Sequence, residues 1–193
     1  VVSQCAQALE RSRLFDEELL LRERSEQLQA MTASLSNALT RTDVANVLVD
    51  ATVEAVSADG AALVTFVEER RLVSTLASRG LEDDPAPWLE VSIDTPTPAT
   101  QALKRRVSAF YGSVEDLQSE FPNAADEIVA SGHSSFLFVP LVAGRRANAL
   151  LVVSWEEPFS LQPEERRFVE SLAGQAAQAL DRATSFETEQ TIA

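Results

Sequence analysis

The side chains able to carry out chemistry are few in this sequence. The chain has one histidine, His133, and one cysteine, Cys5. Covalent and acid–base catalysis need a nucleophile beside a base, or two suitably spaced carboxylates, and no spacing in the sequence indicates such a group. A single cysteine also excludes an internal disulfide and a metal site built from several cysteines. We therefore predict that the chain is not an enzyme.

Another set of residues is suited to holding a small molecule. Residues 81–131 are rich in loops, short helices and aromatic side chains, and such a layer over a sheet is where ligand pockets commonly form. We expect a pocket between residues 98–131 and the strand that follows them. Its predicted wall and rim are Phe110, Tyr111, Phe121, His133, Ser135 and Phe136. The alternative is that the aromatic side chains fill the core beneath a closed lid.

Charge and hydropathy exclude several classes of partner. The 193 residues carry a formal charge of −14, and binding to nucleic acid or to an anionic membrane surface needs a positive field. No apolar run approaches the roughly 18 residues of a membrane span, and no signal-peptide pattern opens the chain. We expect a cytoplasmic protein that binds neither nucleic acid nor membrane.

The sheet must be organised around Ser134–Trp155. Two apolar runs flank a short basic turn that contains Gly144, a pattern that predicts an antiparallel hairpin. Neither run alternates between apolar and polar residues, so other elements must cover both faces of the hairpin. Further strands are predicted at Ala61–Val67, Leu72–Ser78, Trp88–Ile93 and Val107–Tyr111. The fold class is therefore α+β, with an antiparallel sheet of about six strands and helices on both faces.

A long helix is predicted to open the chain, over residues 1–39, which contain neither proline nor glycine. Leucines recur every seven residues along it, as in the seam of a coiled coil: Leu14, Leu21, Leu28 and Leu35. The second seam position is polar in the first half. We expect a parallel homodimer through this coiled coil. The alternative is a single amphipathic helix on the surface of its own domain.

The remaining helices are expected to cover the sheet. Thr42 and Asp43 can cap a helix from Val44 to about Ser57, and a short helix should begin at Pro98 or Ala99. Shorter helical turns are predicted at 114–121 and 124–130. Pro163 suits the first position of a final helix. Its apolar stripe comprises Phe168, Leu172, Ala176, Leu180 and Ala183.

The beginning of the chain repeats its end. Residues 4–18 align without gaps on residues 175–189, and eight of the fifteen pairs are identical. Internal repeats indicate modular arrays. We predict that residues 1–18 are the last helix of a preceding copy of the same domain. Helical composition alone also produces some matches, and this alternative stays open.

With these elements in order, the chain resembles a GAF domain over residues 40–185. Four stretches carry the resemblance: Ala55–Gly60, Thr97–Leu103 with Phe110-Tyr111, Ser134–Leu141 and Phe168–Leu180. The sequence departs from the family pattern at Asn148, which replaces a usual aliphatic residue, and at Ala149 and Ser154, where the family often has glycine.

The resemblance implies a bacterial signalling module with a dimer-forming helical face and a small-molecule pocket. The residues by which family members hold cyclic nucleotides, bilins or haem are missing, so we expect no cofactor, no haem and no metal. Residues 186–193 resemble a linker to a missing output domain, of the serine phosphatase or histidine kinase type. The predicted function is a non-catalytic sensor that dimerises and relays a signal. The alternative is a structural spacer with a closed pocket and no ligand.

Overall fold

The computed structural model describes residues 2–67, 72–81, 92–123, 130–144 and 146–192. Helices and strands follow one another in the order α1 (Val2–Asn37), α2 (Arg41–Ala55), β1 (Gly60–Val67), β2 (Leu72–Arg79), α3 (Pro98–Arg105), β3 (Ala109–Tyr111), α4 (Val114–Glu120), β4 (Ser135–Ala143), β5 (Arg146–Trp155) and α6 (Pro163–Ile192).

The sheet has five strands in the described residues, in the order β2-β1-β5-β4-β3, and each neighbouring pair is antiparallel. The prediction of about six strands was wrong. Most of the strand predicted at 88–93 lies outside the described residues, and its described end is a single β-bridge residue, Ser92, followed by a turn. There the Asp94 N–H donates to Ser92 Oγ at 3.3 Å and the Thr95 N–H donates to the Ser92 carbonyl at 2.9 Å.

The predicted central hairpin is confirmed. β4 and β5 pair from Ser135 opposite Trp155 to Ala143 opposite Arg146. Gly144 follows β4 with φ +59°, a left-handed conformation that glycine adopts without strain. Successive side chains of a strand point to opposite faces, so β4 and β5 contribute to two separate cores.

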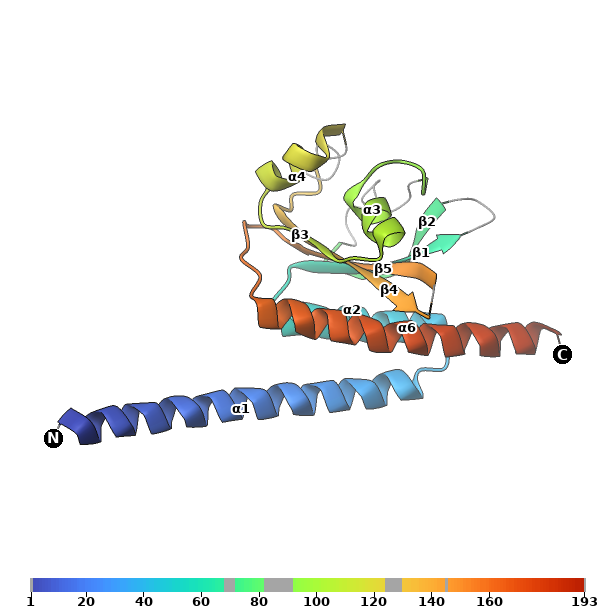
Figure 1. Ribbon diagram of the computed structural model, residues 1–193. Helices are drawn as coiled ribbons and strands as arrows, with labels where there is room; N and C mark the ends of the chain where they lie inside the picture. The colour runs from blue at the N-terminus through green and yellow to red at the C-terminus, as the bar shows by residue number, and fades with distance from the viewer. Residues whose placement is uncertain (1, 68–71, 82–91, 124–129, 145, 193) are drawn as a thin grey trace.

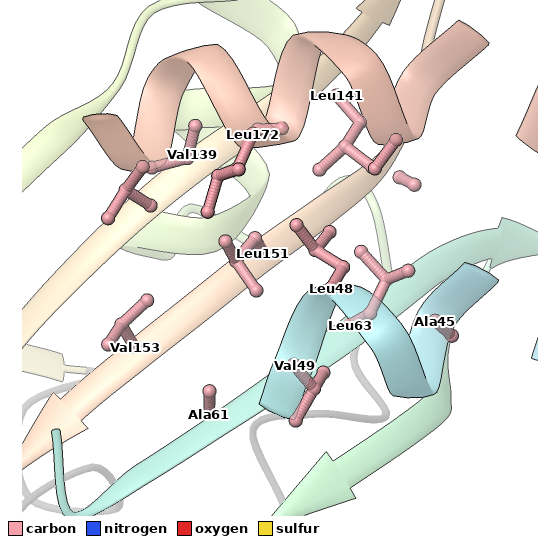
Figure 2. Close-up of a cluster of buried hydrophobic side chains, with 14 of the residues drawn as sticks. Ala45, Leu48, Val49, Ala61, Leu63, Val139, Leu141, Leu151, Val153 and Leu172 are labelled. Carbon is pink, nitrogen blue, oxygen red and sulfur yellow. The ribbon is translucent and has the colours of Figure 1, made fainter. Parts of the chain in front are cut away.

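The first core lies between the sheet and the helices α2 and α6, which run side by side beneath it (Figure 1). Figure 2 shows Leu48 of α2 and Leu172 of α6 converging on Leu63 and Leu151 of the strands. The predicted stripe on α6 is confirmed at Leu172, Ala176, Leu180 and Ala183, which are buried, whereas Phe168 is half-buried.

The second core lies on the opposite face, beneath α3 and α4. Phe136 and Phe138 of β4 are fully buried there, together with Leu117 of α4 and Leu103 of α3. Helices therefore cover both faces of the sheet, as the apolar strands predicted (Figure 1).

The α2 helix begins earlier than predicted. Its N-cap is Thr40, and not Thr42. Thr40 Oγ1 accepts the Asp43 N–H at 3.1 Å, while Asp43 Oδ2 accepts the Thr40 N–H at 3.1 Å. This reciprocal pair satisfies two N–H groups at the helix start, which a cap at Thr42 would leave to solvent.

The long N-terminal helix is present, but the structure shows it as one helix and not as a coiled coil. Leu35 is buried, 3% exposed, in the core of its own domain, so at this position the alternative of a helix packed on its own domain holds. Thr32 Oγ1 also donates to Gln175 Oε1 of α6 at 2.7 Å. The N-terminal part of α1 extends beyond the domain (Figure 1). Leu14, in the first half of the helix, is 60% exposed. The side chains of Leu21 and Leu28 lie outside the described residues.

Candidate functional site

Three of the predicted pocket residues meet beneath the layer formed by α3 and α4. Tyr111 packs edge-on against Phe121, with ring centroids 6.2 Å apart, and against Phe138 at 6.1 Å. Phe138 stacks on Phe136 at 6.2 Å. All four side chains are buried, none more than 8% exposed. The rings therefore contact one another across the region where a ligand was expected.

The hydroxyl of Tyr111 is fixed at the edge of this cluster. It donates to Glu120 Oε2 of α4 at 3.0 Å. Burial, and then the hydrogen bond and negative charge of Glu120, raise the pKa of Tyr111 well above its ordinary value of about 10. Tyr111 is therefore held neutral, as a hydrogen-bond donor that ties α4 to β3.

Phe110 does not join the other aromatic residues. It precedes Tyr111 on β3, so it points to the opposite face of the sheet, where its ring packs edge-on against Trp155 at 6.2 Å. Trp155 in turn stacks on Phe159 at 4.5 Å. Assigning both Phe110 and Tyr111 to one pocket wall conflicts with the alternation of a strand, and this signal was available in the sequence.

Ser135 is a node of hydrogen bonds at the start of β4. Its side chain is 0% exposed. Oγ lies 2.9 Å from the Gly112 carbonyl oxygen and 3.0 Å from that of Glu157, and it accepts the Phe159 N–H at 2.7 Å. Ser135 thus joins the loop after β3 to the loop after β5.

His133 is buried, 7% exposed, and not solvent-facing. Its ring lies 6.4 Å from that of Phe136. Nδ1 lies 3.1 Å from the Ser131 carbonyl oxygen. Nε2 is buried and has no hydrogen-bond partner among the described residues. The turn Ser131–His133 fixes the ring through one nitrogen only.

Sequence reasoning missed a hollow of about 190 Å³ on the other face, at the end of the sheet between α2 and α6. Alanines from β4, β5 and α6 leave this space, and Arg41 and Asp181 lie at its edge. Its lining comprises Arg41, Thr65, Leu141, Ala143, Ala149, Ala177, Leu180, Asp181 and Thr184. The only sequence signal was a run of small residues, which also suits close packing.

A second hollow, of about 350 Å³, lies beside β4 where β3 no longer pairs with it. It is lined by Arg106, Val107, Ser108, Val139, Pro140, Val142, Glu170 and Gly174. Two of its polar residues, Ser108 and Glu170, bond to each other and to the neighbouring Arg166. Ser108 Oγ donates to Glu170, and Arg166 donates to Glu170 Oε1 at 3.0 Å and to the Ser108 carbonyl at 2.8 Å. This cluster joins the start of β3 to α6.

Within the described ranges, no three His, Cys, Asp or Glu side chains are grouped so that they could hold a metal ion. A search of the same residues for a helix of the length and apolarity that a bilayer crossing requires finds none.

Solved structures of similar fold come from several multi-domain proteins. A GAF domain from a phosphoenolpyruvate-protein phosphotransferase of Coxiella burnetii is 17% identical, with a TM-score of 0.71 over 86% of this chain and 96% of that one. A domain of a putative two-component sensor histidine kinase from Sinorhizobium meliloti 1021 is 22% identical, with a TM-score of 0.61 over 77% and 95%.

A GAF domain/HD domain protein from Geobacter sulfurreducens is 17% identical, with a TM-score of 0.63 over 78% and 97%. These likenesses show a shared fold. None of the curated proteins compared with the chain matches it in sequence. The family model of the GAF domain matches residues 38–181, which is most of the chain. The chain therefore belongs to the GAF domain family, as its sheet, its two helical layers and its closing helix indicate.

Proposed function

We propose that this GAF domain is a non-catalytic regulatory module that passes conformational changes from its sheet to α1 and α6, and through them to another domain. Similar folds in a phosphotransferase and in a putative sensor histidine kinase support a signalling or regulatory role. An output domain of the histidine kinase or serine phosphatase type, and a cytoplasmic location, form part of the proposal.

The contact of both terminal helices with one core carries this proposal. α6 lies along the sheet from Val169 to Ala183, and Leu35 of α1 is buried in the same core. The hydrogen bond between Thr32 and Gln175 adds a direct link between the two helices. A displacement of the sheet therefore changes the surface on which both helices pack. A ligand moves such an equilibrium only by its difference in affinity for the two states.

The packing of the insert face favours a second candidate, a spacer without a ligand. Tyr111 packs against Phe121 and Phe138, and Phe138 stacks on Phe136. All four rings are buried, so a small molecule in the expected pocket would have to displace at least one of them. A sensor would open this cluster, whereas a spacer would keep it closed. The two functions therefore make different demands on the same aromatic residues.

Enlarging a side chain under α3 separates these two functions. Ser135 is unsuitable because any replacement also breaks its hydrogen bonds, whereas Ala102 of α3 is buried among apolar neighbours. Ala102→Leu in a filled core should cost about 1–3 kcal/mol of unfolding free energy. A cost below about 1 kcal/mol would indicate room for a ligand. Ala130→Leu, at an exposed position, controls for the added apolar volume.

Native mass spectrometry of the protein purified from its source tests for the ligand itself. A retained small molecule would support the sensor. Its absence, together with a high cost for Ala102→Leu, would support the spacer.

We further propose that the domain forms a parallel homodimer through the first half of α1. Leu14, Phe15 and Leu19 are 60%, 62% and 43% exposed on this helix, and a second copy of the same helix would cover them. Removal of residues 1–30 should abolish association and leave Leu35 and the fold in place. Sedimentation that shows the intact chain as a monomer at tens of micromolar would contradict the proposal.

A further inference from the structure

The buried and exposed positions of α6 can be compared with the first turns of α1, because the repeat relates the two helices at an offset of 171 residues. Seven positions of α6 are buried against the rest of the domain between residues 172 and 183: Leu172, Ala173, Ala176, Ala177, Ala179, Leu180 and Ala183. The residues that stand 171 positions earlier are Val1, Val2, Cys5, Ala6, Ala8, Leu9 and Ser12. Each of them is apolar or small, so the sheet-covering face of α6 is repeated in full.

The exposed face is repeated as well. On α6, Gln178, Asp181, Arg182, Thr184 and Ser185 are exposed, and only Ser185 has an apolar counterpart, Leu14. The counterparts of the other four are Gln7, Glu10, Arg11 and Arg13. All four are polar, and the last three are exposed in α1. Two amphipathic helices always match on both faces at some offset, but here the offset that matches the faces is also the one at which eight of fifteen residues are identical.

The link between α6 and α1 has a counterpart too. Gln175 accepts the hydrogen bond from Thr32, and the residue that corresponds to Gln175 is Gln4, an identical side chain. The repeat therefore preserves the apolar or small character of the positions with which α6 contacts the sheet, and the identity of one residue with which it contacts α1.

We propose that the first three turns of α1 are the closing helix of another GAF domain, which precedes this one in the same polypeptide. The face that contains Cys5, Ala6 and Leu9 covers the sheet of that domain. In the present structure this end of α1 extends away from the sheet (Figure 1). Small residues allow a helix to approach a sheet closely, as Ala176 and Ala177 do on α6.

A single helix then carries both domains in a defined relation. Leu9 faces the preceding sheet, and Leu35 is buried in this domain. The 26 residues between these positions correspond to a rise of about 39 Å and a net rotation of about 80° for a straight α-helix. If one domain rotates this helix about its axis, the helix also rotates against the other domain. The proposed relay then has a second input.

The reactivity of Cys5, the single cysteine of the chain, tests the proposal. The 193-residue chain is compared with the natural polypeptide extended upstream by one domain length. Labelling of Cys5 by a thiol reagent should be at least about tenfold slower in the extended chain, because reaction then requires local opening. In a Cys5→Ala background, Gln7→Cys should label at the same rate in both chains, since Gln7 corresponds to the exposed Gln178.

Equal labelling of Cys5 in the two chains would overturn the proposal, as would an upstream reading frame that encodes no domain of this kind. Labelling at several protein concentrations separates protection within one chain from protection by dimerisation.

A second pair of variants gives an independent readout. In the extended chain, Leu9→Asp should lower the denaturation midpoint of the first domain and leave that of the second unchanged. Arg11→Asp, on the opposite face, should lower neither by a comparable amount. Equal effects of the two substitutions would contradict the assignment of the face.

Discussion

The burial of Leu35 leads to a prediction that separates packing within one chain from pairing between two chains. Leu35 is 3% exposed, with Met31 and Ala38 packed beside it against the core. Leucine-to-alanine changes in a core cost about 2–5 kcal/mol. Because the described contacts of α1 with the domain lie in its last turns, the surroundings of Leu35 can relax. For Leu35→Ala we expect a loss in the lower part of this range, about 2–3 kcal/mol.

The assay is urea unfolding followed by the fluorescence of the tryptophans, of which Trp155 is buried in the same core and lies on β5. For a chain of this length the loss corresponds to a fall of about 5–10 °C in Tm. Leu39→Ala is the matched control. It makes the same change four residues later, at a position 68% exposed and outside the proposed dimer contact, and it should change the free energy of unfolding by no more than about 0.5 kcal/mol.

The dependence on protein concentration decides between the two explanations. If Leu35 packs within its own chain, its effect on the denaturation midpoint is independent of concentration, and sedimentation of Leu35→Ala equals that of the wild type. If Leu35→Ala and Leu39→Ala cost the same, or if the effect of Leu35→Ala vanishes on dilution, the assignment of Leu35 to the core is wrong.

Three further predictions concern single positions. Ser135→Ala should lower the free energy of unfolding by about 1–3 kcal/mol in a denaturant titration, because three part-buried backbone groups lie within hydrogen-bond distance of its buried hydroxyl. Above pH about 10 the unfolded chain releases the Tyr111 proton while the folded chain retains it, so stability should fall as pH rises. Tyr111→Phe should flatten this fall. Gly174→Ala should raise the free energy of unfolding by about 0.5–1 kcal/mol, since an added Cβ meets nothing within 4 Å, whereas Gly144→Ala should lower it because φ is +59°.

Each of these predictions has a plain counter-result. A loss below about 0.5 kcal/mol for Ser135→Ala would mean that solvent forms the hydrogen bonds that Ser135 makes to the backbone of the two loops. Tyr111 is the only tyrosine, so its ultraviolet ionisation band reports on it alone. Ionisation at its ordinary pKa, with the fold intact, would contradict its burial. Equal effects of alanine at Gly174 and Gly144 would mean that backbone conformation does not govern the two sites.

The fold was predictable because the apolar pattern leaves few alternatives. Runs such as Leu150–Val153 are apolar at every position, so both faces of the strand had to be buried. The break between strand and turn at Gly144 and the start of α6 at Pro163 also depend on local chemistry, and both were predicted correctly. Thr40 was missed as a cap because Thr42 and Thr40 both precede an apolar run, and only the reciprocal bond with Asp43 distinguishes them.

The candidate site was less predictable, because residue type does not say which face a side chain occupies. Phe110 and Tyr111 are both aromatic, but they lie in different cores. Ser135 appeared to be a polar rim residue, and it proved to be a buried connector of two loops. The hollow lined by Ala143 and Ala149 arises from space that several elements leave together, and no single element encodes it.

The division of β4 between two cores bears directly on the proposed relay. Phe138 faces the aromatic cluster under α3 and α4, and the next residue, Val139, faces α2 and α6. Interiors are close-packed, so a ring that moves in the aromatic cluster must either find new space or shift the strand that carries it. A shift of β4 moves Val139, and therefore changes the surface on which Leu172 of α6 packs (Figure 2). Coupling between the faces therefore requires no long path, because adjacent residues of one strand belong to both cores.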